Sequence, residues 1–183
     1  MKAERLAIPE VILLQPDRYG DERGFFSEVW HAARFAGAGV DLPFIQDNQS
    51  LSRERGVIRG LHCQIGPNAQ GKLVRCLRGA IWDVAVDARA GSPTYGQWVA
   101  AELSPDNWQQ LWIPPGFLHG FCTLAPDTEV LYKVTAPYDR DAERGVVWND
   151  PSLALPWPIA ETEAILSPKD RALPRWDQTP PLF

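Results

Sequence analysis

The sequence predicts an all-β fold, a sandwich or barrel of short strands with few helices. Short apolar runs recur along the chain, separated by turn residues at intervals typical of all-β domains. Helical periodicity is confined mainly to one short segment, and no internal repeat or low-complexity linker occurs. With 183 residues, 45% of them hydrophobic, the chain can bury one sizeable core, so we expect a single domain over residues 1–183.

The predicted strands follow one another up to residue 134, and each is a run of apolar or β-branched residues bounded by turn signals. In chain order they cover residues 10–15, 25–30, 44–51, 57–64, 72–78, 80–87, 96–103, 109–113, 120–123 and 128–134. A helix is predicted at residues 31–37 and a turn at residues 104–108, which begin Ser-Pro-Asp. Residues 151–183 are rich in Pro and Trp, so we expect an irregular C-terminal strap laid over the body.

Composition limits the partners. The formal charge of -5 and the isoelectric point near 5.2 argue against general binding to nucleic acid or to an anionic membrane. No apolar run approaches the roughly 18 residues of a membrane span, and the N-terminal residues lack the apolar core of a signal peptide, so we expect a cytoplasmic protein. The cysteines, Cys63, Cys76 and Cys122, show no CxxC spacing and are expected to be reduced and buried.

The strand predicted at residues 57–64, VIRGLHCQ, carries an arginine and a histidine. Regular alternation places Arg59 and His62 on opposite faces. Either a bulge at Gly60 brings both side chains to the interior, or only one of them faces it. Lys72 follows within one hairpin, and burying so many cationic or titratable groups is costly unless an anionic ligand or carboxylates compensate. For an isolated histidine, the ordinary alternative is a hydrogen-bonded core residue.

Two short patterns resemble the motifs of cupins. GLHCQ at residues 60–64 takes the place of the first histidine-containing element, and PGFLHGF at residues 115–121 resembles the second. A metal is not expected, because Gln64 stands where metal-binding cupins carry a second histidine, and His31 lies on the predicted helix. These patterns predict a cupin-type jelly roll without a metal site, with a metal-dependent cupin oxygenase or isomerase as a weaker alternative.

A larger set of motifs runs along the chain: DERGFF (21–26), QDN (46–48), RGLH (59–62), QGKLVR (70–75), WIP (112–114) with Gly116 and HGF (119–121), LYK (131–133) and LSPKD (166–170). Together these motifs resemble those of the dTDP-4-dehydrorhamnose 3,5-epimerase family. They occur in the family's order from about residue 8 to residue 170. Any one of them is a weak signal, whereas the whole set in this order is specific.

The resemblance implies a cofactor-free cupin that acts on a dTDP-4-keto-6-deoxyhexose, usually as a homodimer. The hydrogens on C3 and C5 of such a sugar flank the C4 ketone, so a base can remove either one to give an enolate. By resemblance His62 is the base, and Asp170 orients it and keeps it basic. Tyr132 is the acid on the opposite face, and Lys72 stabilises the enolate oxygen.

The resemblance also implies a substrate-binding set. Its members are Arg23, Phe26, Glu28, Gln46, Asn48, Arg59, His119, Tyr138, Glu143 and Lys169. The cationic members suit the diphosphate, the amides and carboxylates suit the nucleoside, and the aromatic ones suit stacking on the base. Asp83 and His119 are expected to be supporting groups near the enolate oxygen. The N-terminal strand of this family often reaches across the dimer, so Arg23, Phe26 and Glu28 are expected to serve the neighbouring subunit.

Two positions depart from the family pattern. Gln49 stands where histidine is usual, and Cys63 where an aromatic residue is usual. Both are expected at the cavity wall, and they leave open how many carbons are inverted. The predicted function is 3,5-epimerisation of dTDP-4-dehydro-6-deoxy-D-glucose to dTDP-4-dehydro-L-rhamnose. The alternatives are a 3-only or 5-only epimerase of another deoxysugar pathway and a noncatalytic sugar-nucleotide-binding cupin.

Overall fold

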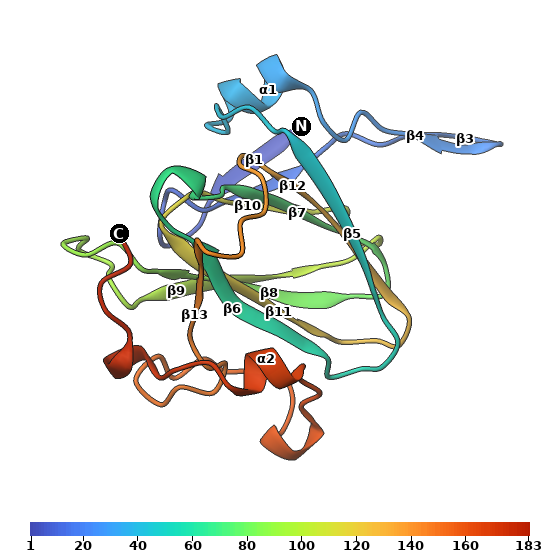
Figure 1. Ribbon diagram of the computed structural model, residues 1–183. Coiled ribbons are helices and arrows are strands. Elements are labelled where there is room, and N and C mark those ends of the chain that lie inside the picture. Colours follow the sequence, from blue (N-terminus) through green and yellow to red (C-terminus); the bar gives the residue numbers. More distant parts are fainter.

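Two antiparallel sheets pack face to face to form the body of the protein (Figure 1). The computed structural model describes all of residues 1–183. The larger sheet has six strands, in the order β1 (Lys2–Arg5), β2 (Ile12–Gln15), β10 (Gln110–Ile113), β7 (Lys72–Arg78), β12 (Thr128–Val134) and β5 (Gln46–Ser52). The smaller sheet has five, in the order β13 (Glu143–Gly145), β6 (Ile58–Gln64), β11 (Phe117–Thr123), β8 (Ile81–Asp87) and β9 (Trp98–Leu103). Neighbouring strands are mostly distant in sequence, as in a jelly roll, and the predicted fold class is confirmed.

Helices are few and short. The α-helices are α1 (Ala32–Gly37) and α2 (Pro168–Arg171), and single 3₁₀ turns lie at Gly66–Asn68, Glu161–Glu163 and Trp176–Gln178. None of these helices has the length and apolar character needed to cross a membrane.

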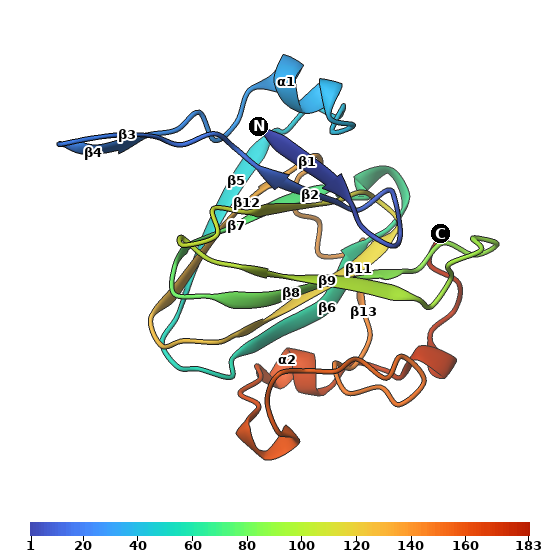
Figure 2. The ribbon, with the colours of Figure 1, turned by 180° about the vertical axis from the view of Figure 1, so that it is seen from behind.

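The two faces of β8 show how the layers are packed. Ile81 points between the sheets and belongs to the main core, together with Val74 of the larger sheet. Val84 points the other way and packs with Leu182 of the C-terminal segment. Residues 151–183, orange to red in Figures 1 and 2, therefore cover the outer face of the smaller sheet as the predicted strap. Because both faces of β8 are covered, its apolar residues need not alternate with polar ones.

The outer face of the larger sheet is covered by α1 and the residues around it. Phe35 is fully buried there in one cluster with Leu73 and Trp112. His31 is the N-cap of α1, and its ring accepts a hydrogen bond from the Arg34 amide at 3.5 Å. This histidine is therefore part of the helix start, on the side of the sheet away from the main core.

A two-stranded hairpin, β3 (Tyr19–Asp21) and β4 (Gly24–Phe26), stands away from the body in both ribbon views (Figures 1 and 2). Its aromatic side chains are exposed, with Phe26 at 70% and Phe25 at 57% of their full surface. Only Phe25 packs against an aromatic ring of the body, edge-on to Trp108 at 4.8 Å between centroids. Exposed aromatic residues on a projecting hairpin are typical of a surface that contacts another molecule.

The predicted strands differ from the structure mainly at short elements. The bounds of β7 and β12 match the prediction, whereas β1, β3 and β13 are missing from it because they are short and lack an apolar alternation. The single strand predicted at residues 25–30 is wrong beyond Phe26, since Gln110 Nε2 binds the Val29 carbonyl at 3.0 Å and holds that segment to the body. β11 begins at Phe117, three residues before the predicted start at 120.

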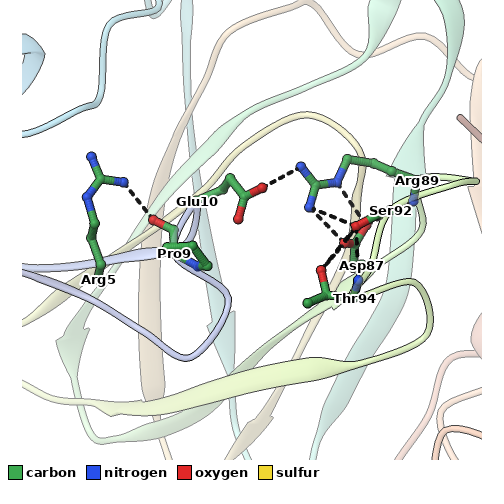
Figure 3. Close-up of polar contacts among 7 residues, drawn as sticks. All are labelled: Arg5, Pro9, Glu10, Asp87, Arg89, Ser92 and Thr94. Atoms are coloured by element: carbon green, nitrogen blue, oxygen red, sulfur yellow. Dashed lines mark hydrogen bonds and ion pairs between the residues drawn. The ribbon is translucent and has the colours of Figure 1, made fainter.

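The end of β8 that carries Asp87 holds a closed network of polar side chains (Figure 3). Asp87 is fully buried, and its Oδ1 accepts from Arg89 Nε at 2.9 Å. Its Oδ2 accepts from the hydroxyls of Ser92 and Thr94, each at 2.6 Å, and from Arg89 Nη2 at 2.7 Å. Arg89 Nη1 continues to Glu10 at 2.9 Å. This network ties the loop after β8 to the turn between β1 and β2.

Candidate active site

A two-lobed cavity opens between the sheets. The lobe bounded by α2, the α2 lobe, measures about 280 Å³ and is lined by Ser50, Arg59, His62, Lys72, His119, Phe121, Tyr132, Ser167, Lys169 and Asp170. The lobe next to β13, the β13 lobe, measures about 200 Å³ and adds Gln46, Asn48, Cys63, Gln64, Gln70, Tyr138 and Glu143. His62, Lys72 and Tyr132 line both lobes, so they lie where the two lobes meet.

A bulge in β6 brings Arg59 and His62 to the same cavity. On β11, His119 pairs with His62 and Phe121 with Arg59, so the register shifts by one residue between these pairs. Gly60 lies at this point with φ of +131°, and a Cβ there would meet the Gly120 Cα at 2.6 Å. A larger residue does not fit, and the bulge hypothesis is confirmed.

His62 and Asp170 form a hydrogen-bonded dyad. Asp170 Oδ1 lies 2.6 Å from His62 Nε2, and the carboxylate is nearly buried. Ser167 caps the short helix α2 by accepting the Asp170 amide at 3.0 Å, which fixes the carboxylate in place. Burial opposes ionisation, but the hydrogen bond and charge of His62 hold the pKa of Asp170 below its usual value. Asp170 therefore accepts the Nε2 hydrogen, which leaves the lone pair of a neutral imidazole on Nδ1.

Tyr132 and Lys72 approach the cavity from the larger sheet, opposite His62. They lie on the paired strands β12 and β7, where Tyr132 is opposite Val74 and Lys72 opposite Val134. Burial raises the pKa of Tyr132, so its phenol keeps its proton at neutral pH. Burial lowers the pKa of Lys72. The cavity thus has a histidine on one wall and a phenol and an amine on the other.

A second histidine–carboxylate pair lies behind the cavity wall. His119 Nε2 is 2.6 Å from Asp83 Oδ1, and Asp83 is fully buried. Burial lowers the pKa of His119, although the Asp83 charge acts in the opposite direction. Asp83 Oδ2 has no hydrogen-bond partner in the protein. Only His119 of this pair lines the cavity.

Polar side chains of the β13 lobe are held together by hydrogen bonds. Gln46 Nε2 donates to Asn48 Oδ1 at 2.7 Å. Glu143 accepts from the Tyr138 hydroxyl at 2.8 Å and from the Lys169 ammonium. Burial alone would raise the pKa of Glu143, but these two donors hold it below its usual value. Glu143 is therefore an anion bridged to a cation and a phenol at the edge of the cavity.

Gln64, at the position of the missing cupin histidine, has a structural role. Its Nε2 donates to the carbonyls of Asn68 and Pro137 at 2.7 and 2.9 Å, and its Oε1 accepts from the Asp139 amide at 2.8 Å. It thereby connects the segments that follow β6 and β12. No group of three or more His, Cys, Asp or Glu side chains converges in a way that could hold a metal ion.

Most of the predicted site residues meet at the cavity. These are His62, Asp170, Lys72, Tyr132, Arg59, His119, Gln46, Asn48, Tyr138, Glu143 and Lys169. Four others do not line the cavity of their own chain, and one of these, Asp83, lies behind its wall. Arg23 and Phe26 lie on the projecting hairpin, where Arg23 binds Asp21, and Glu28 binds Arg34 at 2.9 Å.

One expectation about the cavity wall is wrong. Gln49 points to the outer face of β5 and donates to Glu129 at 3.1 Å, because Asn48 and Ser50 take the inward positions. Cys63 does line the cavity. Sequence reasoning overlooked Ser50, whose place in the alternation after Asn48 could have revealed it. It also overlooked Ser167, which the Ser-Pro-x-Asp start of α2 signals as a helix cap.

The comparisons with known proteins agree on one family. A sequence profile described as dTDP-4-dehydrorhamnose 3,5-epimerase matches residues 5–178. The dTDP-4-dehydrorhamnose 3,5-epimerase of Sinorhizobium fredii is 52% identical over 183 residues, covering 100% of this chain and 93% of that protein. The Pseudomonas aeruginosa protein of the same name is 54% identical over 172 residues, covering 93% of each.

A solved relative has nearly the same backbone. The crystal structure of dTDP-6-deoxy-D-glucose-3,5-epimerase from Legionella pneumophila Philadelphia 1, in complex with dTDP-4-keto-L-rhamnose, matches with a TM-score of 0.93. It is 44% identical in sequence, and the match covers 98% of this chain and 94% of the other.

Proposed function

This chain belongs to the dTDP-4-dehydrorhamnose 3,5-epimerase family and is an isomerase, and we propose that it converts dTDP-4-dehydro-6-deoxy-D-glucose to dTDP-4-dehydro-L-rhamnose. The observation that carries this proposal is the meeting of the His62–Asp170 dyad with Lys72 and Tyr132 in one cavity. The relatives that are about half identical bear the name of this activity. The reaction neither oxidises nor reduces the sugar, so these side chains suffice for its proton transfers.

The first step is removal of a proton next to the ketone. His62 takes the proton from C3 or C5, and the electron pair of the broken C–H bond moves to the C4 oxygen to form an enolate. Asp170 stabilises the resulting imidazolium through the 2.6 Å hydrogen bond. The Lys72 ammonium stabilises the charge on the enolate oxygen, a role whose loss typically costs about 10² to 10³ in rate.

The second step returns a proton to the other face of the sugar. Tyr132 stands on the sheet opposite His62, so its phenol can protonate the carbon that His62 deprotonated, with inversion. The phenolate is then reprotonated by solvent and the imidazolium releases its proton. Each inversion leaves both groups as they began, and a second cycle inverts the other carbon.

The remaining predicted residues would bind the nucleotide. Arg59 and Lys169 suit the diphosphate because guanidinium and ammonium groups pair with phosphate oxygens. Their cavity also holds the amides of Gln46 and Asn48 and the ring of Tyr138, which suit the nucleoside. His119, hydrogen-bonded to Asp83, supports the enolate oxygen beside Lys72. We place the reaction in the cytoplasm, consistent with three free, buried cysteines.

A homodimer would complete the site. The exposed hairpin carries Arg23 and Phe26, which have no place in the cavity of their own chain. In a symmetric dimer, each hairpin would deliver these side chains and Glu28 to the neighbouring cavity. The exposed aromatic ring of Phe26 could then stack on the nucleotide base opposite Tyr138.

Subunit mixing tests this arrangement. Arg23→Ala and His62→Ala proteins are each expected to be nearly inactive, whereas their co-expressed mixture should regain about a quarter of the wild-type activity, from the mixed dimers with one intact site. An Arg53→Ala protein, altered at an exposed ion pair with Asp127, serves as the control and should behave as wild type. No recovery in the mixture would show instead that Arg23 and His62 of the same chain serve one site.

Proton exchange tests the reaction itself. Wild-type protein incubated in D2O with the 4-dehydro-6-deoxyglucose nucleotide should lose the NMR signals of both the C3 and C5 protons, with the L-rhamno product trapped by a reductase. His62→Ala should abolish exchange at both carbons. Loss of one signal would indicate a single-carbon epimerase, and loss of neither would leave a sugar-nucleotide-binding protein.

A further inference from the structure

Asp83 has a buried carboxylate oxygen without a hydrogen-bond partner in the protein. It is fully buried, and only two buried side-chain polar atoms in the protein lack a hydrogen-bond partner, Asp83 Oδ2 and Ser50 Oγ. A buried carboxylate is unfavourable unless a nearby positive charge compensates for it. The unpartnered oxygen therefore calls for a cation in the same part of the core.

His119 does not supply that cation. It donates one hydrogen bond to Asp83 at 2.6 Å, but burial lowers its pKa below 6.5, so the ring is neutral at neutral pH. A neutral donor satisfies one oxygen and supplies no positive charge. Two side chains of the cavity act electrostatically on His119 as positive charges, the titratable His62 and Lys72. Apart from His62, Lys72 is therefore the candidate cation.

Lys72 in turn lacks a close counter-charge. Cys63 of β6 lines the same lobe, but burial raises the pKa of this thiol to about 12, so it is uncharged at neutral pH. Tyr132 faces Lys72 from β12 as a neutral phenol, since burial raises that pKa as well. His62, also on β6, is bound to Asp170.

The other carboxylates near Lys72 are already paired. Glu143 on β13 holds the Lys169 ammonium and the Tyr138 hydroxyl. Asp170 on α2 holds His62. Of the carboxylates whose charges act on Lys72, Asp83 on β8 is the one without a cationic partner.

We propose that Asp83 is the counter-charge that keeps Lys72 an ammonium in the buried cavity, and so acts as a positioning residue for the group that stabilises the enolate. The role of Lys72 here rests on the function proposed above. Lys72 forms no ion pair with Asp83, Glu143 or Asp170, so its hydrogens remain available to the substrate. A charge acting across a gap favours the ammonium without competing for its hydrogen bonds.

The chain is well suited to a direct test because it contains only four lysines, Lys2, Lys72, Lys133 and Lys169. Protein labelled with ¹³C at lysine Cε should give four titrating NMR signals, and a Lys72→Met variant assigns the one of interest. In Asp83→Asn, which keeps an acceptor for His119, the Lys72 midpoint should fall by about one pH unit or more, while the other three stay in place. An unchanged Lys72 midpoint would overturn the proposal.

Asp47→Asn is the matched control. Asp47 binds the Lys133 ammonium at 2.8 Å on the outer face of the larger sheet. Its substitution removes a carboxylate that lies away from the cavity, so it should leave the Lys72 midpoint unchanged. A Lys72 shift of equal size in this variant would show that the probe responds to any lost carboxylate and would also contradict the proposal.

Kinetics separate a counter-charge from a purely structural role. In Asp83→Asn the alkaline limb of the kcat profile should move to lower pH together with the NMR midpoint, whereas loss of structure would lower kcat equally at every pH. The NMR titration needs no turnover. If Asp83→Asn shows the Lys72 shift but the wild-type protein is inactive, only the proposed function is contradicted. If the wild-type protein is active but Asp83→Asn shows no Lys72 shift, only the counter-charge proposal is contradicted.

A second comparison applies if Asp83→Asn does not fold. Lys72→Met alone leaves the Asp83 charge buried without compensation, so at pH 7 it should be less stable than the double variant Lys72→Met/Asp83→Asn. A double variant no more stable than Lys72→Met would overturn the proposal.

Discussion

Asp83 and Asp87 lie on the same face of one strand, β8, and both are fully buried, but their surroundings are opposite in kind. Asp87 receives hydrogen bonds on both oxygens and is paired with Arg89. Asp83 has one neutral donor and one oxygen without a partner. Burial opposes ionisation of Asp87, yet Arg89, Ser92 and Thr94 hold its pKa well below the usual value.

The difference separates a structural charge from a functional one. Around Asp87 every donor and acceptor is satisfied within the chain, which stabilises the fold and leaves nothing for a ligand. Around Asp83 one carboxylate oxygen has no partner, and its hydrogen-bond partner His119 lines the cavity with His62, Lys72 and Tyr132. Substitutions in the first region should therefore reduce stability, and those in the second should reduce activity.

The largest effect is expected at the catalytic end. Asp170→Asn preserves the shape of the side chain but removes the charge that fixes the His62 tautomer, so kcat should fall by about 10³ to 10⁴. Steady-state rates from a coupled reductase assay measure this. Thermal unfolding should show a folded protein, and a kcat within tenfold of wild type would refute the dyad.

Tyr132→Phe should separate proton exchange from inversion. The Tyr132 hydroxyl donates no hydrogen bond that holds the fold, so the melting temperature should stay close to that of wild type while the inversion rate falls by about 10² to 10³. Exchange of the C3 or C5 proton in D2O should persist, because His62 is intact. Inversion at the wild-type rate would exclude Tyr132 as the acid.

The opposite result is expected at the Asp87 network. Asp87→Asn leaves the Arg89 guanidinium without its buried anion, so the free energy of unfolding should fall by about 3 kcal/mol. Below the melting temperature, kcat should be unchanged. Glu10→Gln at the exposed end of the same network is the matched control and should cost under about 1 kcal/mol. Urea titrations measure the free energy of unfolding of both variants. Equal losses would show that the buried carboxylate of Asp87 contributes no more to stability than the exposed carboxylate of Glu10.

The pH dependence of stability should distinguish the same two regions, with a smaller effect. Asp87 has a lower pKa in the folded protein than its ordinary 3.8, so its contribution to stability is present above about pH 4 and is lost as the pH falls towards the folded value. Wild-type stability should therefore decline below pH 4, and Asp87→Asn should decline less steeply there. Parallel curves for the two proteins would show that Asp87 does not carry this acid sensitivity.

The local features of the chain could be predicted because they depend on neighbouring residues. The alternation in β7 and β12 gave their bounds, and Gly60 indicated the bulge that turns Arg59 and His62 to one cavity. The ordered motifs selected the residues that line it. The short strands β1, β3 and β13 escaped prediction because pairing with another strand, rather than their own residues, makes them strands. β1 and β3 pair with the strand that follows each of them, and β13 pairs with the distant β6.

The sequence by itself determined the fold class, the family and the chemical types of the site residues, because strand periodicity, glycine conformations and ordered motifs are written in short stretches of chain. Only the tertiary structure decided which charges meet. It turned Gln49 outward, and it gave Asp87 an arginine while leaving Asp83 without one. The physical reason is that the cost of a buried charge depends on every group around it, and those groups come from strands that pair far apart in sequence.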